Sequence, residues 1–336
     1  MSFINNKLTV RSPGDLVTAV PYLLGFRPSD GSIAVIACRE RRIIFAARGD
    51  SPAVDAPASH LLDLATYLVS VVSQQQPITE LMIVGYGSAD RLDPALTTIA
   101  ETFTTGGMTV RELLRVTGTQ IFNLTCDNPA CCPPHGTPFD PTTSLVAVQA
   151  TAAGLVALPD RAAVAARFAP VAGAGRDGIR RATRAAATRL KALSAAGSRG
   201  GDEAGAQAVR DALRQHDGGE RLTDEEVAWL TVLLKRPSVR DLAVDLTLPH
   251  DGHVTFWADV TRRAEEALVP APATLLAVTA WRCGDGALAA MATERALQVD
   301  PTYQLAELLQ QALHAGLPPS VFEQAIATDA TDPGTK

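Results

Sequence analysis

The sequence predicts a mixed-sheet α/β N-terminal domain followed by an all-α domain. Up to about residue 145, short runs rich in Ile and Val alternate with stretches whose apolar residues recur at helical spacing. After Pro141, helical patterns follow one another. Alternating strands and helices favour a sheet that carries helices, whereas a series of helices favours a helical domain. We therefore expect an α/β domain at 1–145 and an all-helical domain at 146–330.

The first elements are a helix and a hairpin. Ser12 is a favourable N-cap, Pro13 suits the first helical position, and Gly25 supplies a left-handed stop. The runs 32–38 and 42–48 are rich in Ile and Val around a charged turn, which predicts an antiparallel hairpin. The chain is therefore expected to begin in the order helix, strand, strand.

A helix, a buried strand and another helix follow. Residues 61–72 are an apolar helical stretch, and the continuous apolar run 81–84 is typical of a strand that is buried on both faces. The dipeptide Asp93-Pro94 predicts the start of the next helix, because it combines a capping side chain with a proline at the first helical position. A second hairpin completes the expected sheet, with strands at 109–116 and 120–124.

The helical half contains one linker-like segment and one repeat-like unit. Residues 195–205 (AAGSRGGDEAG) predict a flexible linker. One helix pair has the spacing of the second half of a tetratricopeptide motif, in which small residues let paired helices approach closely. Because only one copy is found, an ordinary helical hairpin with the same packing is the alternative. The pattern is carried by Trp281, Gly284, Ala289, Ala296 and Pro301.

Composition limits the possible classes of protein. Hydrophobic residues make up 46% of the 336 residues and charged residues 20%, which excludes a disordered chain. No apolar run reaches the roughly 18 residues that cross a bilayer, and the N-terminus lacks the pattern of a secretory signal. Five cysteines are too few for a disulfide scaffold. We therefore expect a cytoplasmic protein that does not bind membranes.

A basic stretch in the helical half raises the question of nucleic-acid binding. Residues 161–214 contain eleven Arg or Lys against four Asp or Glu, and Arg176, Arg180 and Arg184 fall on one helical face. However, Phe168 is the only aromatic residue of the stretch, and the net charge of the chain is −6. A solvated or internally paired Arg face is therefore the preferred interpretation, with a nucleic-acid partner as the weaker alternative.

The densest group of reactive side chains lies at 126–135, in the sequence CDNPACCPPH. Cys126, Cys131, Cys132 and His135 together have the composition of a tetrahedral zinc site. Neighbouring cysteines are expected to point apart, however, and no second cysteine pair is present. A disulfide from Cys126 is disfavoured in a reducing compartment, and a catalytic thiol lacks a recognisable partner pattern. The preferred interpretation is a proline-rigidified structural corner without a cofactor, with zinc as the alternative.

A second candidate site is the glycine-flanked end of the buried strand. Gly85, Tyr86 and Gly87 stand where ligands bind in open α/β sheets, at the carboxyl end of a strand. They match neither the dinucleotide nor the P-loop fingerprint. Glycine is also the residue that lets a helix or loop cross closely. These three residues are therefore candidate ligand contacts with a packing alternative.

Several segments together resemble a known family. They are RSPGDL at 11–16, AVPYLLGFRP at 19–28, VGYG at 84–87, the cysteine segment at 126–138 and AWRCGDGA at 280–287. In these segments the chain resembles the actinobacterial domain-of-unknown-function family four-one-nine-two. The resemblance implies a bacterial cytoplasmic protein without an established activity. It also implies that an acidic residue commonly stands at the position of His135, which makes this histidine a poor candidate for an obligatory ligand.

The sequence supports three hypotheses for the function. The leading one is a non-catalytic binding or adaptor protein whose partner is another protein, because no catalytic signature is found and helical domains often present protein-binding surfaces. The second is an enzyme or small-molecule sensor that uses the crevice near Gly85–Gly87 together with the loop Cys126–His135. The weakest is a nucleic-acid-associated protein that uses the Arg-rich helix.

Overall fold

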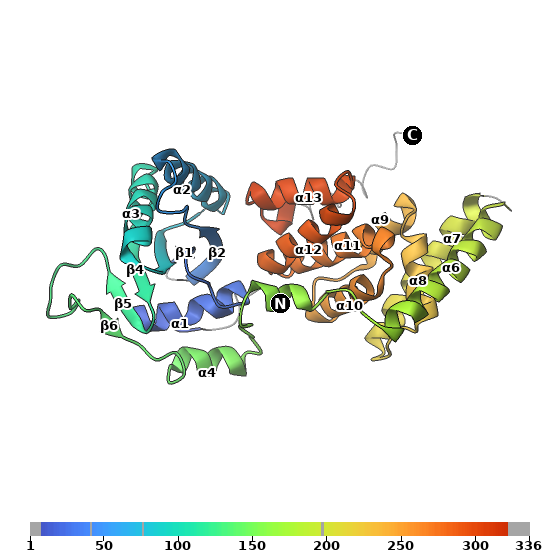
Figure 1. The fold of residues 1–336 in the computed structure, drawn as a ribbon, viewed down its shortest axis with the longest axis horizontal. Helices are drawn as coiled ribbons and strands as arrows, with labels where there is room; N and C mark the ends of the chain where they lie inside the picture. Colours follow the sequence, from blue (N-terminus) through green and yellow to red (C-terminus); the bar gives the residue numbers. More distant parts are fainter. Residues whose placement is uncertain (1–7, 41, 76, 196–197, 322–336) are drawn as a thin grey trace. The chain divides into compact units, whose positions relative to one another are not determined.

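The chain divides into two compact units (Figure 1). The structure is a computed structural model, and it describes residues 8–40, 42–75, 77–195 and 198–321. The first unit extends to Val164 and includes residues 314–318, and the second unit consists chiefly of residues 165–313. An N-terminal region with a mixed sheet followed by a mostly helical region confirms the predicted fold class. The domain boundary expected after residue 145 stays a prediction, because a compact unit need not fold alone.

A six-stranded mixed sheet forms the centre of the first unit. Its strands are β1 (Ser32–Arg39), β2 (Arg42–Asp50), β3 (Glu80–Tyr86), β4 (Val110–Thr117), β5 (Gln120–Asn123) and β6 (Thr137–Pro138). They lie in the order β2-β1-β3-β4-β5-β6, and neighbours are antiparallel except β3 and β4, which are parallel. Both expected hairpins are confirmed, as β1–β2 and β4–β5. Sequence patterns do not predict β6, because two residues are too few to show a period.

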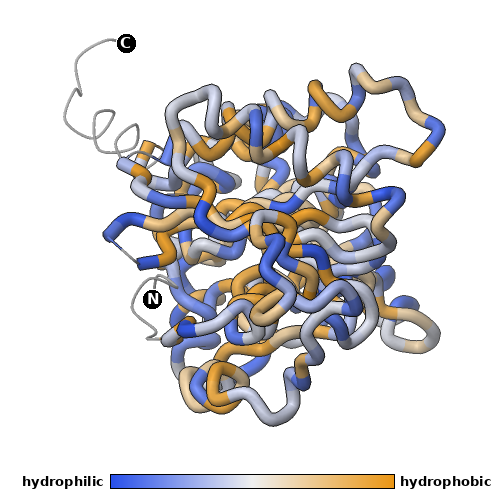
Figure 2. The backbone as a smooth tube through the Cα atoms, turned by 90° about the vertical axis from the view of Figure 1, so that its left-hand side faces the viewer, coloured by the Kyte–Doolittle hydropathy of each residue, from blue (hydrophilic) through white to orange (hydrophobic). Residues whose placement is uncertain are grey.

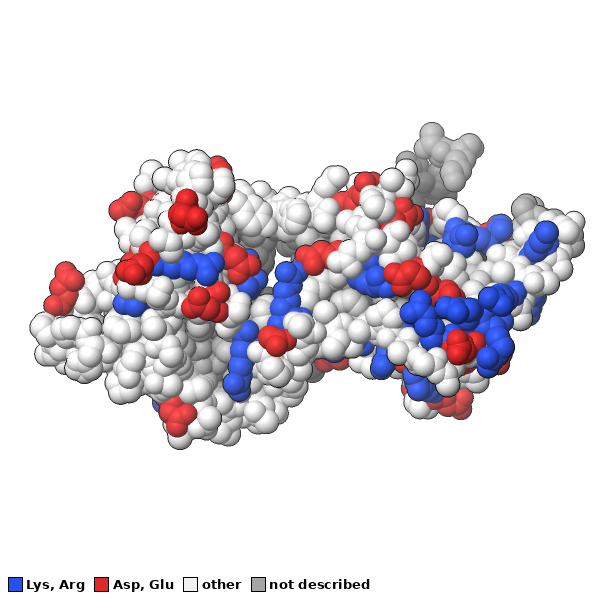
Figure 3. Space-filling view, in the orientation of Figure 1, with Lys and Arg blue, Asp and Glu red and all other residues white. Residues whose placement is uncertain are grey.

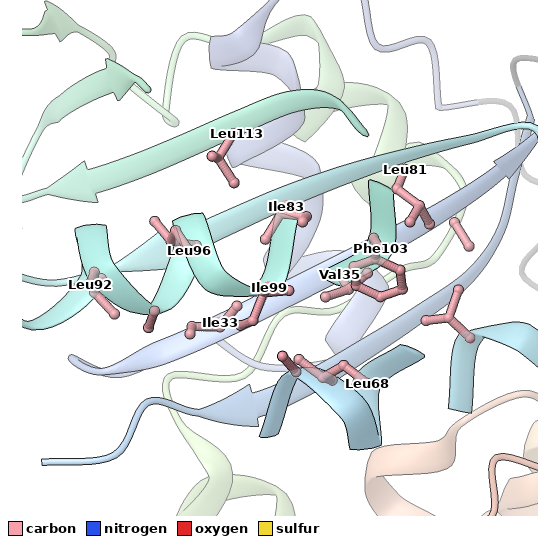
Figure 4. Close-up of a cluster of buried hydrophobic side chains, with 14 residues drawn as sticks. Ile33, Val35, Leu68, Leu81, Ile83, Leu92, Leu96, Ile99, Phe103 and Leu113 are labelled. Carbon is pink, nitrogen blue, oxygen red and sulfur yellow. The ribbon is translucent and has the colours of Figure 1, made fainter. Parts of the chain in front are cut away.

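Helices cover both faces of this sheet. They are α1 (Pro13–Leu24), α2 (Ala58–Ser73), α3 (Ala89–Thr105) and α4 (Leu145–Ala152). On one face, Figure 4 shows side chains of α2 and α3 meeting Ile33 and Ile83 of the sheet in a buried apolar cluster. On the other face, α1 contacts β2 and β4, and α4 lies against α1. Figure 2 shows hydrophobic and hydrophilic residues following one another along the backbone, with many of the hydrophobic segments near the middle of the view.

The helix after β3 begins more than one turn earlier than predicted. It starts at Ala89, so that Pro94 lies inside α3 rather than at its first position. Leu92 is fully buried and belongs to the apolar cluster between α3 and the sheet. Burial of this first turn offsets the backbone hydrogen bond that proline removes. The predicted start at Asp93-Pro94 is therefore wrong.

Helices make up the second unit where the structure describes it. After α5 (Arg161–Ala166) come α6 (Ala174–Ala195), α7 (Ser198–Asp217), α8 (Asp224–Leu233), α9 (Pro237–Leu246), α10 (Asp251–Arg263), α11 (Pro270–Arg282), α12 (Gly286–Val299) and α13 (Gln304–His314), with one 3₁₀ turn at Glu266–Leu268. α6 packs against α8, α7 against α9, and α11 against both α10 and α12.

Residues 198–205 of the flexible linker predicted over 195–205 are helical, and residues 196–197 lie outside the described residues. The flexibility of this segment stays a prediction. The glycines that favoured a linker serve close packing instead. A Cβ at Gly205 would lie 2.2 Å from a methyl carbon of Val239 in α9. A Cβ at Gly201 would lie 3.0 Å from the guanidinium of Arg236. Glycine therefore lets α7 approach closely both α9 and Arg236, the N-cap residue of α9.

α11 and α12 form the helical hairpin that the sequence predicts. They pack against each other, with Gly284 in the left-handed conformation between them (φ 84°) and with Trp281 only 6% exposed. The tetratricopeptide likeness of this hairpin stays a prediction. Like every other helix of the described residues, neither helix is long and apolar enough to cross a membrane.

Candidate functional site

The cysteines of the candidate site lie on the loop between β5 and β6, residues 124–136, which we call the three-thiol loop. Figure 1 shows it extending beyond the edge of the sheet. Asn128 shapes its first half, because its carbonyl oxygen accepts hydrogen bonds from the backbone N–H groups of Cys131 (3.2 Å) and Cys132 (2.8 Å). Its side-chain oxygen accepts from the N–H of Ala130 (3.0 Å). These bonds fold the loop into a tight turn.

The second half of the loop is attached to the sheet by a glycine and by β6. Gly136 has a left-handed φ of 81°, and a Cβ at this position would lie 2.9 Å from the ring of Phe122. Only glycine therefore fits against β5 here. β6 then pairs with β5 directly after the loop. Pro133 and Pro134 restrict the backbone between the cysteines and this attachment.

The three thiols of the loop converge. The Sγ atoms of Cys126 and Cys131 are 3.4 Å apart, and those of Cys126, Cys131 and Cys132 all lie within 4.8 Å of one another. Cys131 is exposed, and the other two are half-buried. The expectation that the neighbouring cysteines point apart is therefore wrong. The turn at Asn128, which binds the N–H groups of both, accounts for their common orientation.

His135 does not join the sulfurs. Within the part of the chain that the structure describes, no histidine or carboxylate has a ligand atom in the three-sulfur group. The structure thus brings together three of the four residues that could form a zinc site by composition. A metal ion held by these sulfurs would have one coordination position left for another ligand.

Hydrogen bonds shift the pKa values of two of the thiols in opposite directions. The backbone N–H of Asn128 donates to the sulfur of Cys126, and the thiols of Cys132 and Cys131 donate to the same atom, which lowers the pKa of Cys126. The bond to Cys126 in turn raises the pKa of Cys132 to about 12. Cys126 therefore becomes a thiolate more readily than Cys132. Its N–H contact with Asn128 also stabilises negative charge on a sulfur that binds a metal ion.

The distances between the sulfurs suit a soft metal ion. With Zn–S bonds of about 2.3 Å, two thiolates of a tetrahedral zinc site lie about 3.8 Å apart. The observed separations, 3.4 Å for Cys126–Cys131 and within 4.8 Å for every pair, are compatible with that value. Three protein ligands and one open position are the arrangement of exchangeable and catalytic zinc sites rather than of closed structural ones.

The glycine-flanked end of β3 lies in a shallow hollow of about 330 Å³ that no described residue of the three-thiol loop lines. Its lining comes from the carboxyl ends of β3 and β4 and the segment before β1: Asp30, Tyr86, Gly87, Ser88, Val116, Thr117 and Gly118. Gly85 is outside it and is explained by packing, because a Cβ there would lie 2.9 Å from Leu96. This hollow is therefore not the shared pocket of both segments that would favour the enzyme or sensor hypothesis.

Tyr86 is a polar residue of this hollow whose hydroxyl is buried and lacks a hydrogen-bond partner among the described residues. Burial raises the pKa of this phenol well above its ordinary value. The phenol therefore stays protonated at neutral pH and does not act as a base.

A second group of ligand-type side chains lies in the second unit, where sequence reasoning missed it. Asp217 at the end of α7 and His250 and His253 at the start of α10 have ligand atoms within 4.8 Å of one another, and we call them the histidine cluster. His253 is only 1% exposed. Its Nδ1 accepts the N–H of Leu248 (2.8 Å), and its Nε2 lies 3.2 Å from the Asp217 carboxylate. The spacing of two histidines three residues apart at a helix start is the sequence signal.

The Arg-rich face of α6 is exposed, as the sequence predicts. Arg176, Arg180 and Arg184 all face solvent, and Figure 3 shows Lys and Arg side chains gathered over the region of α6 and α8 with acidic side chains among them. Arg180 lies 3.7 Å from a carboxylate oxygen of Glu265. This pairing agrees with an internally compensated face. The nucleic-acid hypothesis itself stays a prediction.

Comparison with known proteins assigns the chain to a family. The family model described as a domain of unknown function, DUF4192, matches residues 13–320, which include the three-thiol loop and most of both units. No curated protein and no solved structure matches the chain. By the extent of the family match, the chain belongs to the DUF4192 family.

Proposed function

We propose that this protein is a non-catalytic binding protein whose ligand centre is the three-thiol loop and whose ligand is a thiophilic metal ion, with Zn²⁺ as the first choice. The convergence of three sulfurs within 4.8 Å carries this proposal. Thiolates select ions such as Zn²⁺ or Cu⁺ over Mg²⁺ or Ca²⁺. In a reducing cytoplasm the cysteines stay available as ligands.

The shape of the loop also supports metal binding. The turn at Asn128 holds Cys131 and Cys132 by backbone hydrogen bonds, and Pro133 and Pro134 follow directly. A site that is already ordered before its ligand arrives loses little conformational entropy when it binds. The N–H of Asn128 that donates to Cys126 stabilises the thiolate form that a metal requires.

The open coordination position gives the expected protein partner a point of contact. Cys131 is exposed, so the fourth ligand of a bound ion is accessible from solvent. Water, a small anion or a side chain of a second protein fits this position chemically. The proposal thereby joins the leading hypothesis, a binding or adaptor protein, to a defined group of residues.

Cobalt titration of the reduced protein tests this function, because Co²⁺ is a coloured substitute whose thiolate bonds absorb strongly. We expect one Co²⁺ per chain, displaced by Zn²⁺, and an affinity lowered at least ~100-fold in Cys126→Ser. Two matched controls are His135→Ala, which lies outside the sulfur group, and Cys283→Ser, whose buried thiol has a pKa raised to about 11. Thiolate absorption that is absent in the unmutated protein, or unchanged in Cys126→Ser, contradicts the proposal.

A further inference from the structure

We propose that the three-thiol loop is a redox-gated metal site: oxidation joins Cys126 and Cys131 in an intramolecular disulfide and thereby releases the bound ion. The inference rests on the proposed function, because it concerns the fate of the ion at that site. Its oxidant belongs to the class of peroxides, represented by hydrogen peroxide. The geometry of the sulfurs selects the pair.

The pairing follows from distance and exposure. The Sγ atoms of Cys126 and Cys131 are in van der Waals contact at 3.4 Å, and closing this gap to about 2.05 Å forms a disulfide. Cys131 is the exposed member of the three, so that a small oxidant reaches it first. Cys132 is adjacent to Cys131 in the chain, and a disulfide between neighbours requires a strained backbone. Cys132 is half-buried, so the oxidant reaches it less readily than Cys131, and we assign it as the thiol that stays reduced.

The reaction balances with one peroxide. A thiolate sulfur attacks one peroxide oxygen, the O–O bond breaks, and a sulfenic acid and hydroxide form. The second thiolate then attacks the sulfenic sulfur, the S–O bond breaks, and the S–S bond forms with loss of a second hydroxide. Two electrons pass from the two thiolates to the peroxide. The ion loses two of its three protein ligands, and the remaining thiolate does not hold it.

The surroundings confine this change to the loop. Residues 124–136 extend from the sheet edge (Figure 1) and contribute no side chain that is fully buried. The other two cysteines, Cys38 and Cys283, are buried, and burial raises the pKa of each to about 11, which slows their oxidation. Oxidation of the zinc-free chain should therefore leave its melting temperature nearly unchanged.

The test treats the zinc-loaded full chain with one equivalent of hydrogen peroxide in the presence of a zinc-sensitive dye. We expect one Zn²⁺ released per disulfide formed. Asp127 lies between Cys126 and Cys131, so cleavage before aspartate leaves the two halves of the loop joined only if the disulfide includes Cys126. In the zinc-free reduced chain, Cys132→Ser should form the disulfide at nearly the normal rate, and Cys131→Ser at least ~10-fold more slowly.

The outcomes separate the two proposals. A chain that binds no zinc before peroxide is added contradicts the proposed function. A chain that binds zinc and keeps it after oxidation, or releases it without a disulfide, contradicts only the redox gate. A disulfide that forms equally fast in Cys131→Ser contradicts the assigned pair. Reduction with a dithiol should restore zinc binding, which distinguishes the disulfide from irreversible oxidation of sulfur.

Discussion

The three-thiol loop and the histidine cluster look alike by distance and differ in chemistry. Each brings three ligand atoms within 4.8 Å of one another. In the loop, the Cys126 sulfur accepts a backbone N–H from Asn128 and otherwise meets only other thiols, so a metal can replace their protons. In the histidine cluster, the Nδ1 atom of each histidine already accepts a backbone N–H. Closeness of donor atoms is therefore not enough, since the free lone pairs decide what binds.

The tautomers of the two histidines make this difference concrete. The N–H of Leu248 points at Nδ1 of His253 (2.8 Å), and the N–H of His253 points at Nδ1 of His250 (3.3 Å). Each Nδ1 is therefore an acceptor without a proton, which leaves the single ring proton of the neutral form on Nε2. A metal at Nε2 would displace that proton, and the ring would then either become an imidazolate or move its proton to Nδ1 and lose the backbone hydrogen bond there. We therefore interpret the histidine cluster as structural, with His250 as the N-cap of α10.

The largest effect on stability is expected for His253→Ala. The substitution removes a buried ring and leaves the Leu248 N–H without its acceptor, so the free energy of unfolding should fall by about 3 kcal/mol. Chemical denaturation measures this loss, and the exposed His60 provides the matched control variant His60→Ala. A loss below about 1 kcal/mol would mean that the cluster is free to bind ligands, which would remove the contrast with the loop.

The pH dependence of stability should be the next largest effect. Burial and the neighbouring His250 lower the pKa of His253 from 6.5 against the opposing effect of Asp217. The unfolded chain therefore binds more protons than the folded one below pH 6.5, and stability is fully present above this value and lost as pH falls through the folded pKa. We expect a loss of at most about 1.4 kcal/mol per pH unit, a slope that disappears in His253→Gln. A wild-type protein with flat stability from pH 7 to 5.5 would contradict the buried neutral imidazole.

A smaller effect is expected at the half-exposed cap itself. His250 accepts one helix N–H, and its replacement by alanine should cost about 1 kcal/mol. His250→Asn should recover most of this loss, because asparagine is a good N-cap. Thermal melting of both variants provides the measurement, and equal melting temperatures for the alanine and asparagine variants would show that His250 has no capping role.

The smallest effect concerns Asp217, whose side chain is 53% exposed. Exposed ion pairs contribute little, so Asp217→Asn should change the free energy of unfolding by less than about 1 kcal/mol. The same substitution should leave zinc affinity unchanged if the metal binds at the three-thiol loop. Zinc titration of this variant therefore sharpens the comparison, because a weakened affinity would assign the ion to the histidine cluster.

Local sequence signals predict most of the first unit and fail where tertiary packing decides. Ser12, Pro13 and Gly25 mark the ends of α1 because caps and stops act through backbone hydrogen bonds nearby. Local signals do not predict the start of α3 or the helical conformation of the glycines in α7. Leu92 and Gly205 pack against residues that are far away in the chain, and this packing decides the local structure. Propensity carries no information about such partners.

The candidate site was predictable in composition and not in geometry. The sequence draws attention to Cys126, Cys131 and Cys132, but whether neighbouring side chains converge depends on a turn that Asn128 builds with its own carbonyl and side chain. The position of His135 outside the sulfur group is likewise a property of the folded loop, which composition does not show. Histidine–carboxylate pairing across α7 and α10 could be found only after both helices were in place.

The zinc content of two matched multiple variants tests the central claim most directly. Protein saturated with zinc and freed of excess should contain about one Zn²⁺ per chain in the unmutated form and in Asp217→Asn combined with His250→Gln. It should contain none when Cys126, Cys131 and Cys132 are all replaced by serine. Zinc that persists in the serine variant, or that disappears only from the histidine-cluster variant, would contradict the account.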